Sequence, residues 1–442
     1  MYKKLIFVII FGFLSFFTFS QSIMEREIDY QTYQHYLKND WNNLMKTGKK
    51  AKRNNVDFYY LQYRLGIAYY NKKRYRIAIK HFSKVLDKTP TDETALEYQY
   101  YSYLLGGQAD DAIKLSKKFD SKLKKKIGIN DNLLVSSVDV SMNVSNSLSQ
   151  EIIDNYNYTP LLSNTGYQSI LQNYYNYHLG LLHQLTPSFS VYHAYTHLNK
   201  TDFIALNDGT ALETFNSTIK LNQYYLALKY TFKYNWALSA GIHFLNNRIP
   251  YEKTTGWGAR QQTIIQYTNE NDLVGFVSLE KSISLFNLNI SGSISNLNNQ
   301  TQIQKNVGIT LFPLANLNMY ATYTISHNTL IESSVKTNNL VHQGTIGFKI
   351  TKFLWLETLY AQGIMQNFTT SNSFIVNNSL NPTNKIFNGK LIIPISKKPL
   401  KLWLGYSIWN SESSYLSENS NQKYNKLQLT NQSITGGFIW NF

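Results

Sequence analysis

The last ten residues of the chain, Ser433–Phe442 with the sequence SITGGFIWNF, decide how its second half is interpreted. Residues suited to lipid recur at every second position, namely Ile434, Gly436, Phe438, Trp440 and Phe442. Between them stand Ser433, Thr435, Gly437 and Asn441. Successive side chains of a strand point to opposite faces, so this strand has one face for lipid and one for a wet or hydrogen-bonded interior. The stretch 286–294, FNLNISGSI, alternates in the same way.

Strands of this kind continue from Gly128 to the C-terminus, separated by breaks rich in Asn, Ser and Thr. Each is close to the roughly ten residues that a tilted strand needs to cross a bilayer. The fourteen predicted strands are 133–145, 172–184, 188–199, 219–231, 235–247, 272–282, 285–297, 301–312, 316–327, 339–350, 353–366, 384–395, 400–411 and 427–442.

The connections between these strands differ in length by parity. Every second connection is tight: 185–187, 233–234, 282–284, 313–315, 351–352 and 396–399. The connections between them are mostly long and polar: 146–171, 200–218, 248–271, 328–338, 367–383 and 412–426, with a short one at 298–300. A soluble sandwich has no reason to sort its loops in this way, whereas an outer-membrane barrel does. Residues 129–442 are therefore predicted to form an antiparallel transmembrane β-barrel of about 14 strands.

Aromatic residues near the predicted strand ends fit the girdles of such a barrel. They include Tyr174, Tyr175, Tyr234, Trp236, Trp355, Trp403, Trp409 and Trp440. The terminal Phe438, Trp440 and Phe442 resemble the C-terminal signal by which the barrel-insertion machinery recognises outer-membrane barrels. That resemblance implies outer-membrane lipid and the insertion machinery as partners.

The first 21 residues are predicted to be a secretory signal peptide. Lys3 and Lys4 precede the apolar run Leu5–Phe19, and a polar segment follows with cleavage expected beside Gln21. The run is too short for a membrane-spanning helix, although an uncleaved anchor is the alternative. With this leader and a barrel, the expected location is the outer membrane, with the segment before the barrel in the periplasm.

Residues 22–128 have the 3.6-residue period of helices and are expected to be a separate domain. Leu65, Gly66, Tyr69, Ala78, Phe82 and Pro90 stand at the spacing of the tetratricopeptide pattern. One repeat further on, Tyr103 and Ala112 recur in register, although Tyr100 stands in the place of the glycine. The segment resembles two to three tetratricopeptide repeats, with a generic helical hairpin array as the alternative. Both are docking scaffolds, so a periplasmic protein is the expected partner.

Composition excludes several classes of site. The chain of 442 residues has no cysteine, which excludes disulfides, thiolate metal sites and a cysteine nucleophile. Its net charge of +16 is concentrated in the helical part, which holds about 22 basic and about 12 acidic residues. The barrel is nearly neutral, so we do not expect a nucleic-acid partner.

No standard catalytic or phosphate-binding motif occurs in the sequence, so no enzymatic activity, catalytic residue, cofactor or metal is expected. His193 and His197 share a strand face, but strand geometry keeps them roughly 13 Å apart, too far for one metal. Charged residues within strands are few and are expected to face the lumen, because lipid exposure is costly. They are Lys229, Glu280, Lys349, Glu357 and Lys401, and the two glutamates are expected to pair with Lys229 or Lys349.

The layout of repeats followed by one barrel resembles the YaiO-type outer-membrane barrel proteins. It is also similar to exporters of secreted polysaccharides, which usually have a longer repeat array and more strands. We therefore expect a non-enzymatic barrel whose repeats recruit a partner for export or assembly of an envelope polymer, with a polysaccharide as the first candidate. A sealed barrel that anchors an envelope complex is the alternative, and a lipid-modifying barrel enzyme is the third.

Overall fold

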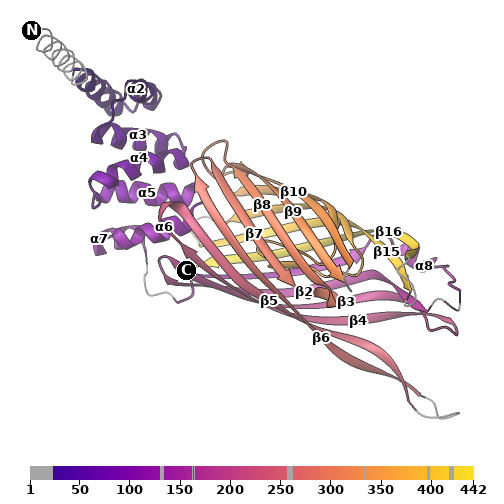
Figure 1. The fold of residues 1–442 in the computed structure, drawn as a ribbon. Helices are drawn as coiled ribbons and strands as arrows, with labels where there is room; N and C mark the ends of the chain where they lie inside the picture. Colours follow the sequence, from indigo (N-terminus) through magenta and orange to yellow (C-terminus); the bar gives the residue numbers. More distant parts are fainter. Residues whose placement is uncertain are drawn as a thin grey trace, which may run out of the picture. The chain divides into compact units, whose positions relative to one another are not determined.

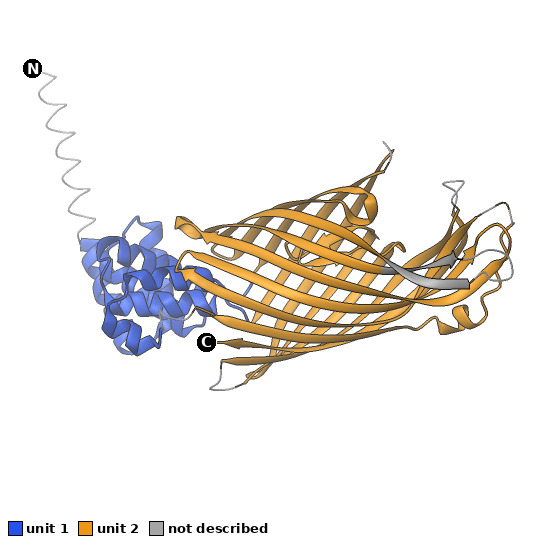
Figure 2. Ribbon diagram, turned by 90° about the horizontal axis from the view of Figure 1, so that it is seen from below, with its two compact units in different colours: residues 1–131, 312–317 blue, residues 132–311, 318–442 orange. Residues whose placement is uncertain are grey.

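The computed structural model describes residues 23–129, 134–161, 163, 165–255, 262–332, 335–395, 399–417 and 423–442. The predicted signal peptide lies outside these residues. The chain divides into two compact units, shown in different colours in Figure 2. The first comprises residues 1–131 together with 312–317, and the second comprises 132–311 and 318–442.

The first unit is helical from its first described residue. A helix over residues 23–37 is followed by α2 (Trp41–Arg53), α3 (Tyr59–Asn71), α4 (Tyr75–Lys88), α5 (Glu93–Leu105), α6 (Ala109–Leu115) and α7 (Ser121–Ile127), which Figure 1 labels. Aspartates at the N-caps of α2, α5 and α7 accept hydrogen bonds from backbone amides of the first turn. Such caps satisfy donors that a helix start leaves free, and Gly128 ends α7 in the left-handed conformation.

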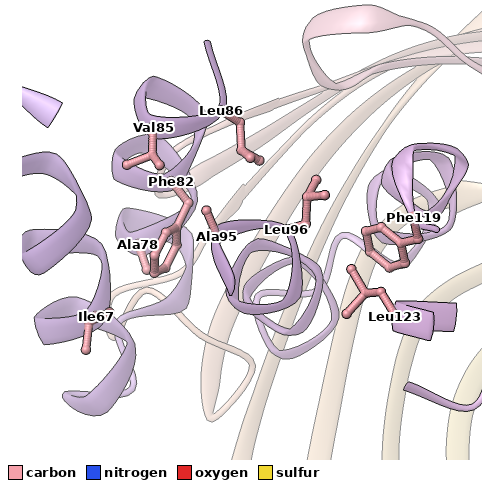
Figure 3. Packing of buried hydrophobic residues seen from close by; sticks show 9 residues of the cluster. All are labelled: Ile67, Ala78, Phe82, Val85, Leu86, Ala95, Leu96, Phe119 and Leu123. Carbon is pink, nitrogen blue, oxygen red and sulfur yellow. The ribbon is translucent and has the colours of Figure 1, made fainter. Parts of the chain in front are cut away.

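The core of this unit lies between consecutive helices (Figure 3). Ala78 and Phe82 of α4 are fully buried against Ala95 and Leu96 of α5. A Cβ on Gly66 of α3 would lie 2.7 Å from the Phe82 ring, so this position admits only glycine without a shift. Of the other residues chosen for repeat packing, Leu65, Tyr103 and Ala112 are buried, Tyr69 stacks on His81, and Pro90 follows the end of α4.

Residues 312–317 belong to this unit by their contacts, although they join two strands of the second unit in sequence. Arg76 of α4 is 2% exposed; its guanidinium donates to the Gly106 carbonyl at 2.8 Å and lies 4.0 Å from the Phe312 ring centroid. Burial lowers the pKa of Arg76 to about 10. A buried charge is costly without such partners, so Arg76 ties 312–317 to the helices.

The second unit is a closed barrel of 14 antiparallel strands, which confirms the predicted fold of helices followed by a barrel. Each strand pairs with its sequence neighbour in the barrel, and β1 closes the ring on β16. Because the ring closes, every strand has a partner on both sides along the part where all 14 strands run together, as a membrane requires. The barrel strands are β1 (Ser137–Ser147), β2 (Gly166–Thr186), β3 (Phe189–Asn207), β4 (Leu212–Thr231), β5 (Trp236–Thr255), β6 (Gln262–Ile283), β7 (Phe286–Ser295), β8 (Thr301–Leu311), β9 (Met319–Glu332), β10 (Val335–Thr351), β11 (Leu354–Met365), β14 (Thr383–Pro394), β15 (Leu400–Ser417) and β16 (Lys423–Asn441).

The outer surface carries an apolar belt. Phe286, Leu288, Ile290 and Ile294 of β7 are exposed, while the serines between them are not. On β16, Ile434, Phe438 and Trp440 are exposed in the same way. Farther from the short turns the belt ends in tyrosines that are 40–49% exposed: Tyr175, Tyr177, Tyr195, Tyr224, Tyr323, Tyr360 and Tyr406. Five of their hydroxyls bond polar side chains, as expected at a membrane interface.

The predicted girdle was wrong for Trp355 and Trp403. Leu402 and Leu404 are exposed, so Trp403 between them faces inward, where its ring lies against Gly437. On β11 the exposed Tyr360 marks the outer face, and Trp355, an odd number of residues away, lies on the inner face. The Lys349 ammonium lies over the Trp355 ring. Tyr174 and Trp409, two further residues of the predicted girdle, pack on each other with ring centroids 6.2 Å apart.

Several strands extend well past the predicted bounds. The predicted strand 272–282 is β6, which has 22 residues, and the predicted loop 200–218 is mostly strand, since β3 ends at Asn207 and β4 begins at Leu212. A strand needs only about 9–11 residues to cross a bilayer. The extra residues lie beyond the tyrosines, where both faces can be polar and the alternation therefore disappears. No helix among the described residues is long and apolar enough to cross a membrane.

Candidate functional site in the barrel interior

The connection from β11 to β14, predicted to be a polar loop over 367–383, contains a small hairpin. Its strands are β12 (Phe368–Thr370) and β13 (Ile375–Asn377), which pair only with each other. We call residues 366–382 the lumenal hairpin. It belongs to no strand of the wall, so its position is set by contacts with inward-facing side chains.

The lumenal hairpin is bonded to three strands of the wall. Tyr225 of β4 donates its hydroxyl to the Asn372 carbonyl at 2.9 Å, and His243 of β5 donates through Nδ1 to the Ser373 carbonyl at 2.8 Å. On β8, the Gln304 amide donates to the Thr369 carbonyl at 2.7 Å and accepts from the Thr369 amide at 3.0 Å. The hairpin leaves the ring between β11 and β14, and β4 and β5 lie on the far side of the 14-strand ring from there, so the segment that reaches them crosses the inside of the barrel.

Three apolar side chains fasten the hairpin in addition. The Phe374 ring contacts Tyr225, His178 and Tyr192, with centroid distances of 5.1, 5.2 and 6.1 Å. Phe368 is 3% exposed in a cluster with Val341, Ala361 and Met365. Val376 packs on Leu221, Leu245, Val274 and Leu297. Each aromatic pair contributes about 0.5–1.5 kcal/mol beyond its buried area.

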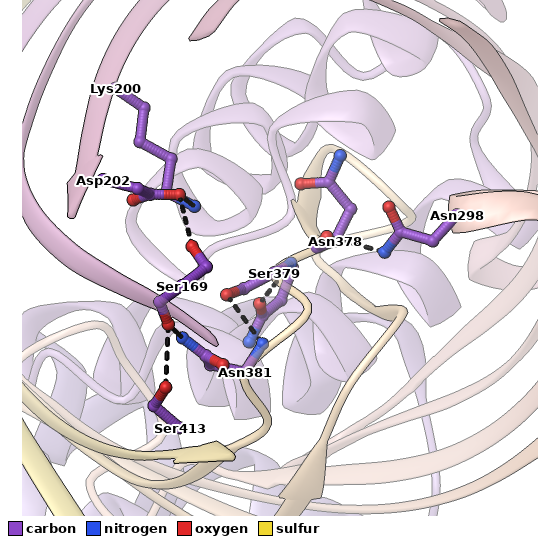
Figure 4. Close-up of polar contacts among 9 residues, drawn as sticks. Ser169, Lys200, Asp202, Asn298, Asn378, Ser379, Asn381 and Ser413 are labelled. Carbon is purple, nitrogen blue, oxygen red and sulfur yellow. Dashed lines mark hydrogen bonds and ion pairs between the residues drawn. The ribbon is translucent and has the colours of Figure 1, made fainter. Parts of the chain in front are cut away.

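Side-chain amides fix both ends of the hairpin. Asn298, between β7 and β8, donates to the Asn367 side chain and to the Asn378 carbonyl, each at 2.7 Å. Asn381 donates to the Ser169 carbonyl of β2 at 2.7 Å, and Ser413 of β15 donates to the same carbonyl at 2.8 Å. Figure 4 shows Asn381 of the hairpin and Ser413 of the wall meeting at Ser169, with the Asn298 bond to Asn378 apart from them.

The same region holds a buried ion pair. Asp202 of β3 is 2% exposed, and its Oδ2 lies 2.7 Å from the Lys200 ammonium. The Ser169 hydroxyl donates to the same oxygen at 3.0 Å (Figure 4). A buried carboxylate requires such compensation, and the Ser169 bond links β2 to this carboxylate of β3 beside the hairpin.

The tip of the hairpin is strained. Ser371, Asn372 and Ser373 are consecutive residues with φ of 53°, 55° and 60°, the left-handed region that glycine prefers. Each such residue costs about 1–2 kcal/mol unless its surroundings compensate. The carbonyls of Asn372 and Ser373 accept the bonds from Tyr225 and His243, so contact with the wall holds this conformation.

Beneath the tip, toward the end where β1 begins, lies a polar cluster. His178 of β2 has one ring nitrogen 2.8 Å from the Asp139 carboxylate and the other 3.0 Å from the Thr196 hydroxyl. The Tyr192 hydroxyl donates to the two Asp139 oxygens at 3.2 and 3.1 Å. With both nitrogens engaged, the imidazole is held in one orientation, and it supports the Phe374 ring.

The charged residues predicted to face the lumen lie in this lower part. Lys229 of β4 reaches Glu280 of β6 at 3.5 Å. Glu357 of β11 accepts a hydrogen bond from the Tyr320 hydroxyl. The Lys349 ammonium lies 4.3 Å from the Trp355 ring centroid rather than beside a carboxylate. Lys401 is exposed near the start of β15.

Inward-facing aromatic rings lie flat on the wall over glycines of neighbouring strands. A Cβ on Gly180 would lie 2.2 Å from the Tyr192 hydroxyl, and one on Gly347 would lie 2.2 Å from Tyr320. The same holds for Gly241 under Phe276 and for Gly437 under Trp403. These glycines are needed for close approach, which keeps the rings out of the centre of the lumen.

Histidines do not form a metal centre. Among the described residues, no group of three or more His, Asp or Glu side chains is arranged to hold a metal ion. His183 and His193, which sequence analysis did not pair, have their Nε2 atoms 3.1 Å apart. His193 also contacts the Tyr224 hydroxyl and His183 the Leu134 carbonyl, so each ring is used in a chain of hydrogen bonds. His197 bonds Asn222 separately at 2.8 Å.

The hairpin and the residues that hold it were not predicted from the sequence. Gln304, Tyr225 and His243 occupy ordinary inward positions, and nothing in their local sequence distinguishes them. The one available signal was the run 371–373 of Ser, Asn and Ser beside Phe374. A small polar turn flanked by Phe and Ile is typical of a hairpin rather than of an extended loop.

Comparisons with known proteins give likeness of fold only. No family model matches the chain, and no curated protein matches it. A FadL homologue from Pseudomonas aeruginosa is 8% identical with a TM-score of 0.43, covering 70% of this chain and 90% of that one. The Pseudomonas putida toluene transporter TodX is 8% identical with a TM-score of 0.42, covering 72% and 91%. The translocator domain of autotransporter NalP from Neisseria meningitidis is 8% identical with a TM-score of 0.31, covering 75% and 98%.

At these values the similarities carry no argument about function. The chain's own architecture is that of an outer-membrane β-barrel: a closed ring of 14 strands, an outward apolar belt ending in tyrosines, and tight turns at one end.

Proposed function

We propose that this protein is a non-enzymatic outer-membrane barrel that its own lumenal hairpin closes at rest. Its helical array recruits a periplasmic partner, and the pair supports export or assembly of an envelope polysaccharide. The observation that carries the proposal is the hairpin, which bonds β4, β5 and β8 from inside the ring. A barrel that passes a polymer must not leak when idle, and a firmly held segment in its lumen meets that need.

The periplasmic position of the array is supported by chain connectivity. Strand β1 begins at Ser137, and the last strand ends beside it, where the Phe442 amide donates to the Ser136 carbonyl at 3.0 Å. This is the end with the tight turns, such as 187–188 and 284–285. In outer-membrane barrels the tight turns lie in the periplasm, so the array that precedes β1 would lie there.

The proposed family follows the same layout. We propose that the helices are tetratricopeptide-like repeats and that the chain belongs with YaiO-type barrels. Support comes from Gly66, which faces the Phe82 ring as the pattern requires, and from the length of α3 and α4, with 13 and 14 residues.

A sealed barrel that anchors an envelope complex is the second candidate. The number of independent contacts favours it: Phe368, Phe374 and Val376 are each packed on the wall, in addition to the hydrogen bonds at both ends. In that case the hairpin would never leave, and the helical array would be the functional surface.

Single-channel recording of the purified full-length protein tests closure at rest. We expect no steady conductance in KCl, while folding is verified by a gel migration that changes on heating. A steady open channel in the wild-type protein would refute closure. Crosslinking in intact cells tests recruitment: a photoreactive residue at Tyr60, which is 61% exposed on α3, should capture a periplasmic protein. The same group at Tyr234, 83% exposed in a tight turn, is the control.

A further inference from the structure

The geometry points to a binding site for an uncharged, hydroxyl-rich glycan on the wall that the lumenal hairpin now covers. The hairpin is then a competing occupant, and its hydroxyl and amide groups take the places of sugar hydroxyls. This inference rests on the proposed function and names the chemistry of what the barrel binds.

The side chains that hold the hairpin are uncharged. They are Tyr225, His243, Ser293, Asn298, Gln300, Gln304 and Asn328. The charged residues Lys229, Glu280 and Glu357 lie elsewhere in the lumen and bond other partners. Lys200 and Asp202, beside the hairpin, neutralise each other in a buried ion pair. A wall of amides and hydroxyls binds neutral hydroxyl groups well and gives a polyanion no counter-charge.

The amides on β8 and β9 form a continuous row. Gln302 donates to Gln304 at 3.2 Å and to Asn328 at 3.1 Å, and Gln304 donates to Asn306 at 2.7 Å. All lie on inward positions, where Gln302, Gln304 and Asn328 are buried. Amide side chains carry donors and acceptors together, so such a row can follow successive hydroxyls of a chain without a fixed register.

Thr369 of the hairpin is bonded as a sugar hydroxyl would be. Its Oγ1 lies 3.1 Å from the Ser293 hydroxyl, 3.2 Å from the Ser373 hydroxyl and 3.4 Å from the Gln304 side-chain oxygen. Beside it, Phe374 lies edge-on to the Tyr225 ring at 83°, which is itself stacked on Phe276 at 4°. Once Phe374 leaves, these rings present apolar surface beside the hydrogen-bonding row, the combination that a sugar ring matches.

The strained tip makes exchange feasible. Ser371, Asn372 and Ser373 keep their left-handed conformation in contact with Tyr225 and His243, and they lose that strain on leaving the wall. The strain energy released on leaving offsets part of the binding energy of these wall contacts. A ligand therefore needs less binding energy to displace the hairpin than the contacts alone would require.

The test uses two full-length variants in planar bilayers. In one, residues 368–377 are replaced by Gly-Ser-Gly; in the other, Phe374→Ala keeps the hairpin but removes its tip contact. We expect both variants to conduct in KCl. Maltoheptaose, a neutral glucose oligomer, should then interrupt the current. Gln304→Leu in the hairpin-replaced variant, where Gln304 no longer bonds Thr369, should weaken the interruption by about tenfold, the effect of one lost hydrogen bond. Asn388→Leu, an inward amide on β14 that bonds Ser407, is the matched control and should change it little.

Several results would overturn the inference. The first two are a current that maltoheptaose does not interrupt and stronger interruption by an acidic oligogalacturonate of equal length. The other two are equal effects of Gln304→Leu and Asn388→Leu on the interruption, and a correctly folded hairpin-replaced barrel that does not conduct. Conductance of the wild-type protein would instead contradict closure at rest. In that event interruption that depends on Gln304 would still support the site.

Discussion

Replacing Phe374 with alanine should loosen the lumenal hairpin without unfolding the barrel. The ring has three aromatic neighbours, at centroid distances of 5.1, 5.2 and 6.1 Å. At about 0.5–1.5 kcal/mol for each of the three pairs, the loss spans about 1.5–4.5 kcal/mol, and the middle of that range, about 2–3 kcal/mol, is expected. The free energy of hairpin opening should fall by that amount, because Phe374 lies outside the wall and its removal breaks no strand pairing. The open population should therefore rise roughly 30- to 150-fold.

Hydrogen exchange of the purified full-length protein measures this directly. Amides of 366–382 should exchange faster by that factor in Phe374→Ala, while those of β7 and β8 keep their wild-type rates. Leu380→Ala is the matched control, because Leu380 is 40% exposed in the same connection. Equal exchange in wild type and Phe374→Ala would show that the ring does not hold the hairpin. Faster exchange throughout the barrel would show instead that Phe374 supports the wall.

Three further predictions concern positions where space or charge is tightly constrained. Gly66→Ala should destabilise the helical unit, because the new Cβ would meet the buried Phe82 ring at 2.7 Å. Overpacking costs about 1–3 kcal/mol, whereas the gain in helix propensity is about 1 kcal/mol. In thermal melts, Phe82→Leu in the same chain should recover part of the lost stability. Burial lowers the pKa of His81 to about 4, so the folded state keeps this imidazole neutral and is fully stable only above the unfolded pKa of about 6.5. The free energy of unfolding should therefore fall by about 2 kcal/mol from pH 7 to pH 5, measured by hydrogen exchange in α3 and α4. His81→Gln should flatten this dependence of stability on pH. Gly347→Ala should displace Tyr320 from Glu357 and slow acquisition of the folded gel form, whereas the same change in a Tyr320→Ala background should be tolerated; equal slowing in both would contradict the packing explanation.

The barrel was predictable because each of its strands must present apolar side chains to lipid on one face. Alternation in 286–294 and 433–442 gives the faces correctly, and the sorting of tight and long connections gives the strand number. The outer halves of β5 and β6 were missed because they lie past the tyrosine belt, where no lipid constrains the pattern.

The interior of the barrel was less predictable. Its contacts join residues far apart in sequence, such as Thr369 with Gln304 and Tyr225 with Asn372, and no local pattern marks either partner. Charged residues could be assigned to the lumen from the cost of lipid exposure, and the expected pair of Lys229 with Glu280 forms across an intervening strand. The second expected pair does not form, because Glu357 bonds Tyr320 and Lys349 rests on Trp355, a ring expected in the girdle.

The position of the lumenal hairpin is the central claim, and one engineered disulfide tests it. The chain has no cysteine, so Ser293→Cys and Thr369→Cys introduce the sole pair, at side chains whose oxygens are 3.1 Å apart across the hairpin and β7. In cells that carry the double variant in the outer membrane, we predict near-complete bond formation, seen as a linked 293–369 peptide by mass spectrometry. Both single variants, and Ser293→Cys combined with cysteine at the exposed Leu380, should give none. A correctly folded double variant in which 293 and 369 stay unlinked under oxidation would contradict a barrel filled by its own hairpin.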